Sequence, residues 1–519
     1  MAESNSSSDA QRNRLFLGIC LALIPTGASF ALVSNILVPL KQQFILTNYQ
    51  VGLIGGAALW GMALSLLIMG PLLEGFGLKN GARLAFAGHL IGLTLMISAA
   101  GRVGDPSAFW ILMAGAAILA AGNGMIEVTG NPLVAALFPE QKTKYLNRFH
   151  AFFPFGIVLG GIVGFVLATW GGRFANWPYQ IGVIYLPILV YGWLVLPRDF
   201  PKTENAAHGI PVGEMFRYTL TKPLFILMLA LMAVTTSLEL GPMRWVPAVL
   251  QSAGLHGILV LVWISGWMVV LRSQAGHAVK RLQPTGMLFA ASILTGSGLF
   301  LLSFATTTIG AFAAATIFAW GVAFFFPTMV GVVAEKMPRT GSLGIVLTAG
   351  MGLGMAGAVG VPVLGKLADR YLAQSLPAST ADVLRQVDQQ FPAYVTRAHS
   401  AADRGSLGYR EREVADALAA TRAALAVQQQ SGSIKNDAAS NALRAIVGTA
   451  IPNEPLVGRA NAILQPAEAA AGQRSFRYVA PAALVLVVVF GLMFAGDRRR
   501  GGYRAVRMDE SAAQGKVRL

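Results

Sequence analysis

Long apolar runs are the feature that most restricts what this chain can fold into. Twelve of them lie at about 15–38, 50–73, 82–100, 107–134, 149–170, 177–196, 223–250, 255–276, 284–304, 307–333, 341–364 and 477–496. An α-helix needs ~20 apolar residues to cross the ~30 Å hydrocarbon core of a bilayer, so each run is a candidate span. Composition agrees, because only 12% of the residues are charged, about half the ~25% of soluble domains. The sequence therefore predicts an all-α membrane protein and excludes soluble, disordered and fibrous classes.

The order of the runs divides the chain into two similar halves. Six runs precede a polar segment and six follow it, which predicts two six-helix bundles. The expected organisation is an N-terminal tail 1–14, a first bundle 15–196, a linker 197–222, helices seven to eleven at 223–365, an inserted segment 366–475, the twelfth helix at 476–497, and a basic tail 498–519.

Basic residues orient the predicted helices. The net charge of +16 does not indicate nucleic-acid binding, because lysines and arginines lie between apolar runs rather than in an aromatic-rich patch. They gather in alternate connections and at both ends of the chain, and we place Arg272 with them. The short connections in between hold only Lys41, Arg102 and Arg173. By the positive-inside rule both termini are expected in the cytoplasm, and the bilayer is expected to be a bacterial inner membrane.

The connection 366–475 is too long for an ordinary loop. By the helix count it lies outside the cytoplasm. It is rich in Ala, Gln and Arg, and the stretch from Arg410 to Leu418 begins an Ala-rich amphipathic pattern that predicts several helices. Since it has few large apolar residues, we expect a thin core that packs on the membrane domain or is partly disordered, and it could bind an unknown partner.

The two halves also share local patterns. In the first half, Glu140 follows Asn131-Pro132 eight residues after the proline. In the second half, Glu335 follows Phe326-Pro327 at the same distance. Weak symmetry between halves is typical of transporters that are built from repeats and bind their solute near the midplane.

A carboxylate inside the fourth run is the strongest candidate for chemistry. Asn123, Glu127 and Asn131 follow one another at intervals of four, which places them on one helix face. Charges at membrane depth are costly and are usually functional. Burial favours the neutral form of a carboxyl, so Glu127 could exchange a proton near neutral pH. The functional interpretation is a protonation or solute site; the alternative is a structural carboxylate held by the two asparagines.

Other polar residues extend this candidate site. Glu239 and Arg244 share the seventh run but are five residues apart, so they do not pair directly on a regular helix. Arg244 and Trp245 are expected near the outer mouth of a cavity, although Arg244 could equally snorkel to the interface. His150 begins the fifth run and could share a proton with Glu127, or it could be an ordinary hydrogen-bonding residue.

No recognised catalytic, nucleotide-binding or metal-binding motif occurs. The only cysteine, Cys20, lies in the first run, so neither an internal disulfide nor a cysteine metal cluster is possible. We therefore expect no enzyme activity, no cofactor and no metal.

Several segments resemble the fucose:proton symporter family of the major facilitator superfamily. They are Asn35 to Pro39 with Leu46 to Ile54, Glu127 to Pro132, Leu146-Asn147 with Phe152 and Gly156, Gly365 to Arg370, and Gly70 to Arg83. The resemblance covers about 15–365 and 477–496. It implies the major facilitator fold of two six-helix bundles and alternating access to a small solute.

The resemblance also implies roles for individual residues. In that family a carboxylate on the fourth helix handles substrate and proton, and Glu127 matches it. A second acid on the first helix is replaced by Asn35, and two polar sugar-binding positions are occupied by His150 and Phe153. We expect a symporter for a small polar solute, most simply a sugar, with Asn35, Asn123, Asn131, Glu239 and Trp245 along its pathway. The coupling ion could be a proton or sodium, or coupling could be absent. Alternatives are a facilitator or exporter of an amphiphilic compound and a non-transporting receptor or scaffold.

Overall fold

The computed structural model describes residues 2–44, 48–103, 105, 107–203, 212–252, 257–400, 411–449 and 451–506. Parts of the predicted linker, of the inserted segment and of the C-terminal tail therefore lie outside the described residues. Within those ranges, eleven helical segments are long and apolar enough to cross a membrane, and Gly257–Ser273 is a shorter apolar helix. They follow the order of the twelve apolar runs, and the predicted all-α, twelve-helix class is confirmed.

The described part of the first half contains six spans made of nine helices and two short 3₁₀ turns. Its elements are α1 (Ala2–Leu21), α2 (Leu23–Phe44), α3 (Asn48–Phe76), α4 (Leu78–Ser98), η1 (Ala99–Gly101), α5 (Ser107–Leu137), α6 (Lys142–His150), α7 (Phe152–Trp170), η2 (Gly172–Ala175), α8 (Trp177–Gly182) and α9 (Tyr185–Val195).

The second half follows a short connecting helix. Its elements are α11 (Val212–Thr221), α12 (Pro223–Ser252), α13 (Gly257–Ser273), α14 (Ala275–Leu302), α15 (Thr308–Val322), α16 (Phe325–Lys336), η3 (Pro338–Thr340), α17 (Gly341–Met355), η4 (Ala356–Gly360) and α18 (Val361–Ser375), with α23 (Ala482–Arg499) as the last span. Between α18 and α23 come α19 (Thr380–Ser400), α20 (Glu411–Ser431), α21 (Asp437–Gly448) and α22 (Pro455–Val479).

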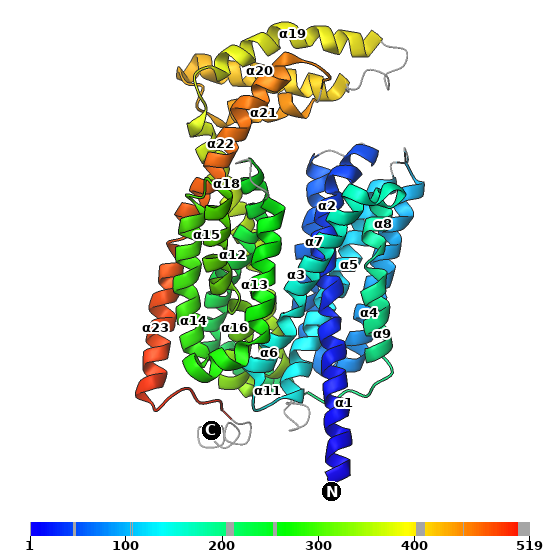
Figure 1. Ribbon diagram of the computed structural model, residues 1–519, viewed down its shortest axis with the longest axis vertical. Coiled ribbons are helices and arrows are strands. Elements are labelled where there is room, and N and C mark those ends of the chain that lie inside the picture. Colours follow the sequence, from blue (N-terminus) through cyan, green and yellow to red (C-terminus); the bar gives the residue numbers. More distant parts are fainter. Residues whose placement is uncertain are drawn as a thin grey trace.

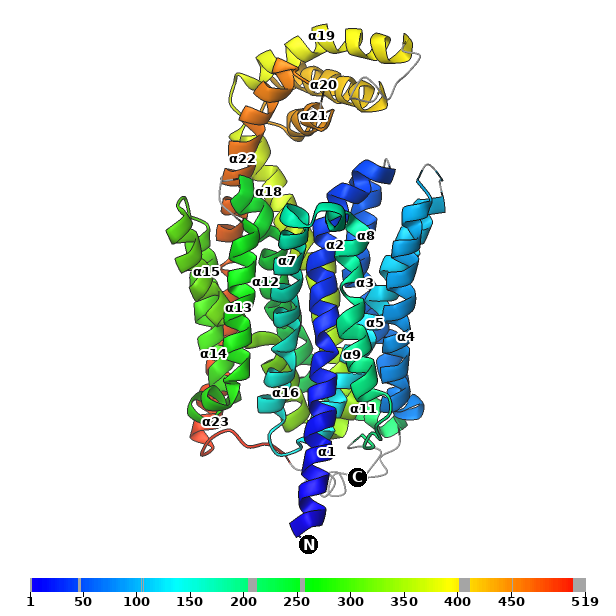
Figure 2. The same cartoon turned by 45° about the vertical axis from the view of Figure 1, so that its right-hand side comes forward.

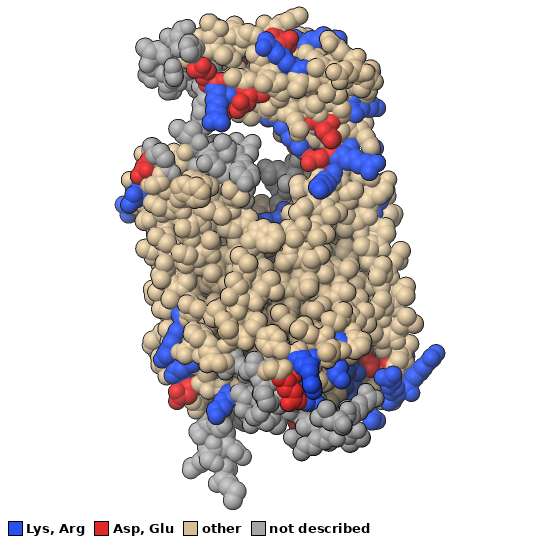
Figure 3. Space-filling model, turned by 180° about the vertical axis from the view of Figure 1, so that it is seen from behind, with Lys and Arg blue, Asp and Glu red and all other residues tan. Residues whose placement is uncertain are grey.

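The two halves stand side by side as helical bundles (Figures 1 and 2). The start of α1 and the end of α23 lie at the same end of the molecule, which we call the termini end. Helices α19, α20 and α21 lie beyond the opposite end, which we call the far end, and extend from above the second half toward the first. On the face shown in Figure 3, the middle of the bundle carries almost no charged side chains, and lysines and arginines gather at the termini end. This distribution is the one expected of a membrane-spanning bundle.

Helices α19–α22 have a hydrophobic core of their own. Small and medium apolar side chains, among them Leu384, Phe391 and Leu443, form a cluster separate from that of the bundle. Helices α18 and α22 connect it to the bundle, since α22 also packs against α12. The sequence predicted a thin core that packs on the membrane domain or is partly disordered; in the described residues the core contains many alanines, which allow close helix packing.

Several predicted spans are interrupted at positions that the apolar pattern does not mark. The first run is split between α1 and α2, the fifth between α6 and α7, and the eleventh by η4, a π-helical turn. Such turns are frequent at functional sites. Apolar periodicity could not reveal these breaks, because lipid-facing and buried positions are equally apolar.

Close helix contacts shape the interior around the midplane. A Cβ atom at Gly27 of α2 would lie 2.0 Å from the carbonyl oxygen of Phe153, and one at Gly156 of α7 would lie 2.4 Å from that of Ile24. Only glycine permits this approach of the two helices. It brings the ring of Phe153 to within 6.1 Å of the ring of Phe30, and both rings reach the central cavity.

Candidate functional site

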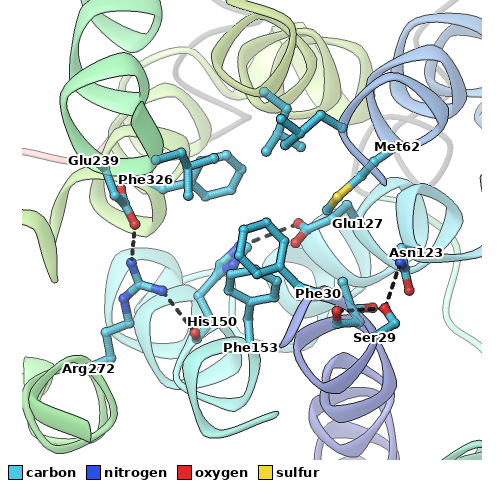
Figure 4. A pocket seen from close by; sticks show the side chains of 14 residues that line it. Ser29, Phe30, Met62, Asn123, Glu127, His150, Phe153, Glu239, Arg272 and Phe326 are labelled. Atoms are coloured by element: carbon cyan, nitrogen blue, oxygen red, sulfur yellow. Dashed lines mark hydrogen bonds and ion pairs between the residues drawn. The ribbon is translucent and has the colours of Figure 1, made fainter. Parts of the chain in front are cut away.

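A central cavity of about 50 Å³ lies between the two halves. Helices α2, α3, α5, α6 and α7 line it from the first half, and α12, α13, α16 and α17 line it from the second. Its polar residues are Thr26, Ser29, Asn123, Glu127, His150, Glu239 and Arg272; its apolar residues are Phe30, Leu59, Met62, Phe153, Leu240, Phe326 and Leu353. Side chains from both halves thus converge on one space (Figure 4).

Glu127 is the acidic centre of the first half. Its side chain is buried, and its Oε2 atom accepts a hydrogen bond of 2.6 Å from Asn131 Nδ2. The Asn131 Oδ1 atom is 2.7 Å from His150 Nε2, and the same His150 nitrogen is 3.7 Å from Glu127 Oε2. The structure therefore brings together three residues that the sequence analysis proposed. A proton could pass between the carboxyl and the imidazole through small movements, because both are within reach of one amide.

Asn123 is the next polar residue along the same face of α5. Its Nδ2 atom donates to Ser29 Oγ at 3.1 Å, and its Oδ1 atom is 3.0 Å from His89 Nε2. The other ring nitrogen of His89 contacts the Tyr191 hydroxyl at 2.9 Å. His89, on α4, is fully buried and fixes the orientation of Asn123.

Arg272 is the cavity residue that sequence analysis misplaced. We expected it with the basic residues at the cytoplasmic end, but its side chain is buried in the cavity. Its Nη2 atom donates to Glu239 Oε1 at 2.9 Å. Its Nε and Nη1 atoms donate to the carbonyl oxygens of Ala323 and His150, at 2.6 and 3.0 Å. One signal was available: Arg272 lies inside the eighth apolar run, as Arg244 lies inside the seventh, whereas Arg83 and Arg477 lie at the very start of theirs.

Four proposed site residues lie outside the cavity lining, and one of them, Asn131, binds the lining residues Glu127 and His150. Asn35 is exposed on α2 and donates to Gln180 Oε1 at 2.9 Å. Trp245 donates from Nε1 to the carbonyl oxygen of Val361 at 3.2 Å. The five-residue spacing predicted that Arg244 and Glu239 do not pair, and they do not. The Arg244 guanidinium instead stacks 4.4 Å from the ring centroid of Phe30. Arg244 therefore contacts Phe30 of the cavity wall without lining the cavity itself.

The termini end of the cavity is closed by contacts between the halves. Lys142 Nζ donates to the carbonyl oxygen of Ala334 at 3.2 Å, and the Thr143 amide donates to Glu335 Oε1 at 2.8 Å. Asn147 Nδ2 adds a contact of 3.2 Å to Thr328 Oγ1. These bonds connect the start of α6 to α16. In this conformation the two halves are held together below the cavity.

Comparison with known families identifies the fold. The model of the Major Facilitator Superfamily matches residues 19–359. The chain belongs to the major facilitator superfamily. Members of this superfamily are transporters, not enzymes. In the described part of the chain, no group of three or more potential metal ligands occurs.

The individual relatives of this chain are distant in sequence. The chain is 31% identical over 134 residues to the L-fucose-proton symporter of Escherichia coli (strain K12); the match spans 25% of this chain and only 30% of that relative. The crystal structure of the transporter FucP in the outward conformation superposes with a TM-score of 0.54 and 19% identity, over 68% of this chain and 92% of that one.

Two further structures share the architecture. The proton:xylose symporter XylE gives a TM-score of 0.59 at 15% identity, over 69% of this chain and 89% of its own. A bacterial homologue of the human lysosomal transporter Spinster, in an inward-facing conformation, gives a TM-score of 0.56 at 15% identity, over 93% of this chain and 97% of its own. At these identities the likeness shows the fold of the superfamily.

Proposed function

We propose that this protein is a secondary active transporter that moves a small polar solute, a sugar in the simplest case, by alternating access and in symport with protons. Binding would take place in the central cavity, and the two bundles would rock around it. The coupling proton would be carried by Glu127, with His150 as its neighbour.

The observation that carries this proposal is the position of Glu127. Its carboxyl group is buried in a cavity that both bundles line, and Asn131 holds it 3.7 Å from an imidazole nitrogen. A carboxyl in such a place binds a proton when charge is costly and releases it when water reaches the cavity. Loading and release can therefore follow the opening of either end.

The polar lining supports a hydroxylated solute. Glu127, Asn123 and Ser29 offer acceptors and donors on one side of the cavity, and the rings of Phe30, Phe153 and Phe326 offer apolar faces. Sugars present both hydroxyl groups and an apolar ring face, so this combination suits them. The relatives named for fucose and xylose symport agree with this solute class.

The decisive experiment compares wild type with Glu127→Gln in proteoliposomes. A panel of neutral sugars that begins with L-fucose and D-xylose is tested for accumulation driven by an imposed pH gradient and for exchange without a gradient. We expect Glu127→Gln to abolish accumulation and to retain exchange, because the amide preserves shape but cannot release a proton. Asp199→Asn, at a side chain that is 94% exposed, is the matched control.

Two results would contradict this proposal. Unchanged pH-driven accumulation in Glu127→Gln would remove Glu127 from coupling, and accumulation that follows an imposed sodium gradient would identify sodium as the coupling ion.

The apolar half of the cavity favours one second candidate, a facilitator or exporter of amphiphilic compounds. Phe153 occupies a position where the resemblance implies a polar sugar-binding residue, and its ring faces that of Phe30. Under this alternative, aryl glycosides and other amphiphiles would be transported in preference to free sugars, and Glu127→Gln would leave net flux unchanged.

We further propose that the termini end is cytoplasmic and that α19–α22 lie outside the cytoplasm, in a bacterial inner membrane. The gathering of basic side chains at the termini end supports this orientation (Figure 3). If α19–α22 instead serve a receptor or scaffold that binds an external partner, deletion of 371–474 would abolish the role of the protein, whereas a transporter would keep part of its flux.

A further inference from the structure

Two arginines of the second half hold the first half from opposite sides of the cavity. Arg272, on α13, donates from Nη1 to the carbonyl oxygen of His150 on α6 at 3.0 Å. Its side chain is 2% exposed, and its other nitrogens bind Glu239 and Ala323 within its own half. This single hydrogen bond therefore extends from a fully braced guanidinium across the interface (Figure 4).

Arg244, on α12, makes the corresponding contact further along the molecule. Its Nη1 atom donates to Ser34 Oγ on α2 at 3.0 Å, and its Nη2 atom donates to the carbonyl oxygen of Gly55 on α3 at 3.3 Å. The guanidinium also lies 4.4 Å from the ring centroid of Phe30, a residue of the cavity wall. All three contacts are with the first half.

The two arginines lie at different heights between the termini end and the far end. Helix α12 starts beside α11 at the termini end and runs toward the far end (Figure 1). Glu239, which binds Arg272, precedes Arg244 by five residues on that helix, or about 7.5 Å at 1.5 Å per residue. Arg272 thus crosses the interface on the termini side of the cavity, and Arg244 crosses it on the far side.

We propose that Arg272 and Arg244 are alternating latches: separation of the halves at the termini end breaks the Arg272–His150 bond, and separation at the far end breaks the Arg244 bonds to Ser34 and Gly55. The proposal rests on the alternating access proposed above and adds the residues that set its balance. Rocking about the cavity opens one side while it closes the other. Each latch therefore stabilises only conformations that are closed on its own side.

A cysteine in the cavity can report which side is open without knowledge of the solute. Thr26 lines the cavity, is 2% exposed, and its Oγ1 atom makes no hydrogen bond to any described residue. Thr26→Cys on a Cys20→Ala background therefore removes no described bond of that side chain. The labelling rate by a membrane-impermeant thiol reagent is measured in right-side-out and in inside-out vesicles, and a C-terminal tag cleaved by external protease identifies the termini side.

Opposite effects are expected from the two arginines. Arg272→Gln should raise the ratio of labelling from the termini side to labelling from the far side, roughly tenfold or more for one lost charge-assisted bond. Arg244→Gln should lower the same ratio. Arg83→Gln is the control, because Arg83 contacts Asn80 within its own helix, and it should leave the ratio unchanged.

Loss of Arg272 leaves Glu239 unpaired in the interior, which can destabilise the fold. The double variant Glu239→Gln/Arg272→Gln removes that charge and should show the same increase in the ratio, and Arg272→Lys should shift it less. Shifts of equal sign for Arg272→Gln and Arg244→Gln, or no shift in a folded double variant, would overturn the latch proposal. Because the assay uses no solute, these outcomes are independent of whether sugar uptake is detected.

Discussion

Removal of the Glu335 carboxylate should open the termini end of the cavity. Glu335, at the end of α16, accepts a hydrogen bond of 2.8 Å from the amide of Thr143, the second residue of α6. The carboxylate is fixed from its own half, because Tyr503 donates to its other oxygen at 2.8 Å. Of the two hydrogen bonds to this carboxylate, the one from Thr143 crosses between the halves and is lost when the end opens, whereas the one from Tyr503 is kept.

The size of the effect follows from that one bond. A hydrogen bond to a charged group contributes about 1.5–3 kcal/mol, and an acidic group at a helix N-terminus adds about 0.3–1 kcal/mol. Glu335→Ala should therefore weaken the closed state by about 2–3 kcal/mol, which multiplies the open-to-closed ratio about 30- to 150-fold. The contacts of Lys142 and Asn147 across the same interface remain and limit the opening.

The thiol-labelling ratio at Thr26→Cys measures this shift directly. Asp199→Ala is the matched control, since its ion pair of 3.3 Å to Lys79 connects two parts of the first half at the same end. It should leave the ratio unchanged. An unchanged ratio in Glu335→Ala, or an equal change in Asp199→Ala, would refute the argument that the α6–α16 contact closes this end.

Three further predictions concern packing, the outer helices and the C-terminal segment. Gly92→Ala places a Cβ atom 2.3 Å from the backbone of α5 and should destabilise the protein by about 1–3 kcal/mol in thermal unfolding, whereas Gly56→Ala, with open space around it, should not. Arg444→Met removes partly exposed ion pairs from α21 to α18 and α22. It should lower the free energy of unfolding of the outer helices by about 1 kcal/mol or less per pair and hasten their proteolysis without altering uptake. Burial raises the pKa of Tyr503 well above its usual value, and the neighbouring Glu335 adds to this. The stability linked to that proton is thus present below about pH 10 and is lost only as the pH rises through the higher folded-state pKa. A difference in tyrosinate absorbance between wild type and Tyr503→Phe below about pH 10 would contradict this.

Much of the fold could be predicted from the sequence because a bilayer imposes length. A run such as 107–134 can cross the hydrocarbon core only as a helix, and its backbone must be satisfied internally. The breaks at Ala22 and Ala151, and the π-turn from Ala356 to Gly360, depend on which neighbour each helix packs against. No periodicity records that choice where both faces are apolar.

The candidate site was predicted only in part, and Glu127 and Arg272 show why. A carboxylate in the middle of an apolar run contradicts its surroundings, so Glu127 stands out from sequence alone. Arg272 lies one residue before the end of α13, where a basic residue is equally expected at a membrane interface. Its bonds to Glu239 and to the His150 carbonyl come from α12 and α6, which only the tertiary structure brings together.

The pairing of charges in the cavity bears on which solutes can bind. Arg272 is committed through all three of its nitrogens to Glu239, Ala323 and His150, so it has little capacity left to bind an anion. Glu127 meets only an amide and an imidazole, and the cavity is therefore electrically balanced when Glu127 is protonated and His150 is neutral. A carboxylate or phosphate on the solute would add an unpaired negative charge to a buried space, at a cost of several kcal/mol. A neutral solute avoids that cost. Under the proposed mechanism its binding would favour the protonated state of Glu127, which is the linkage that proton symport requires.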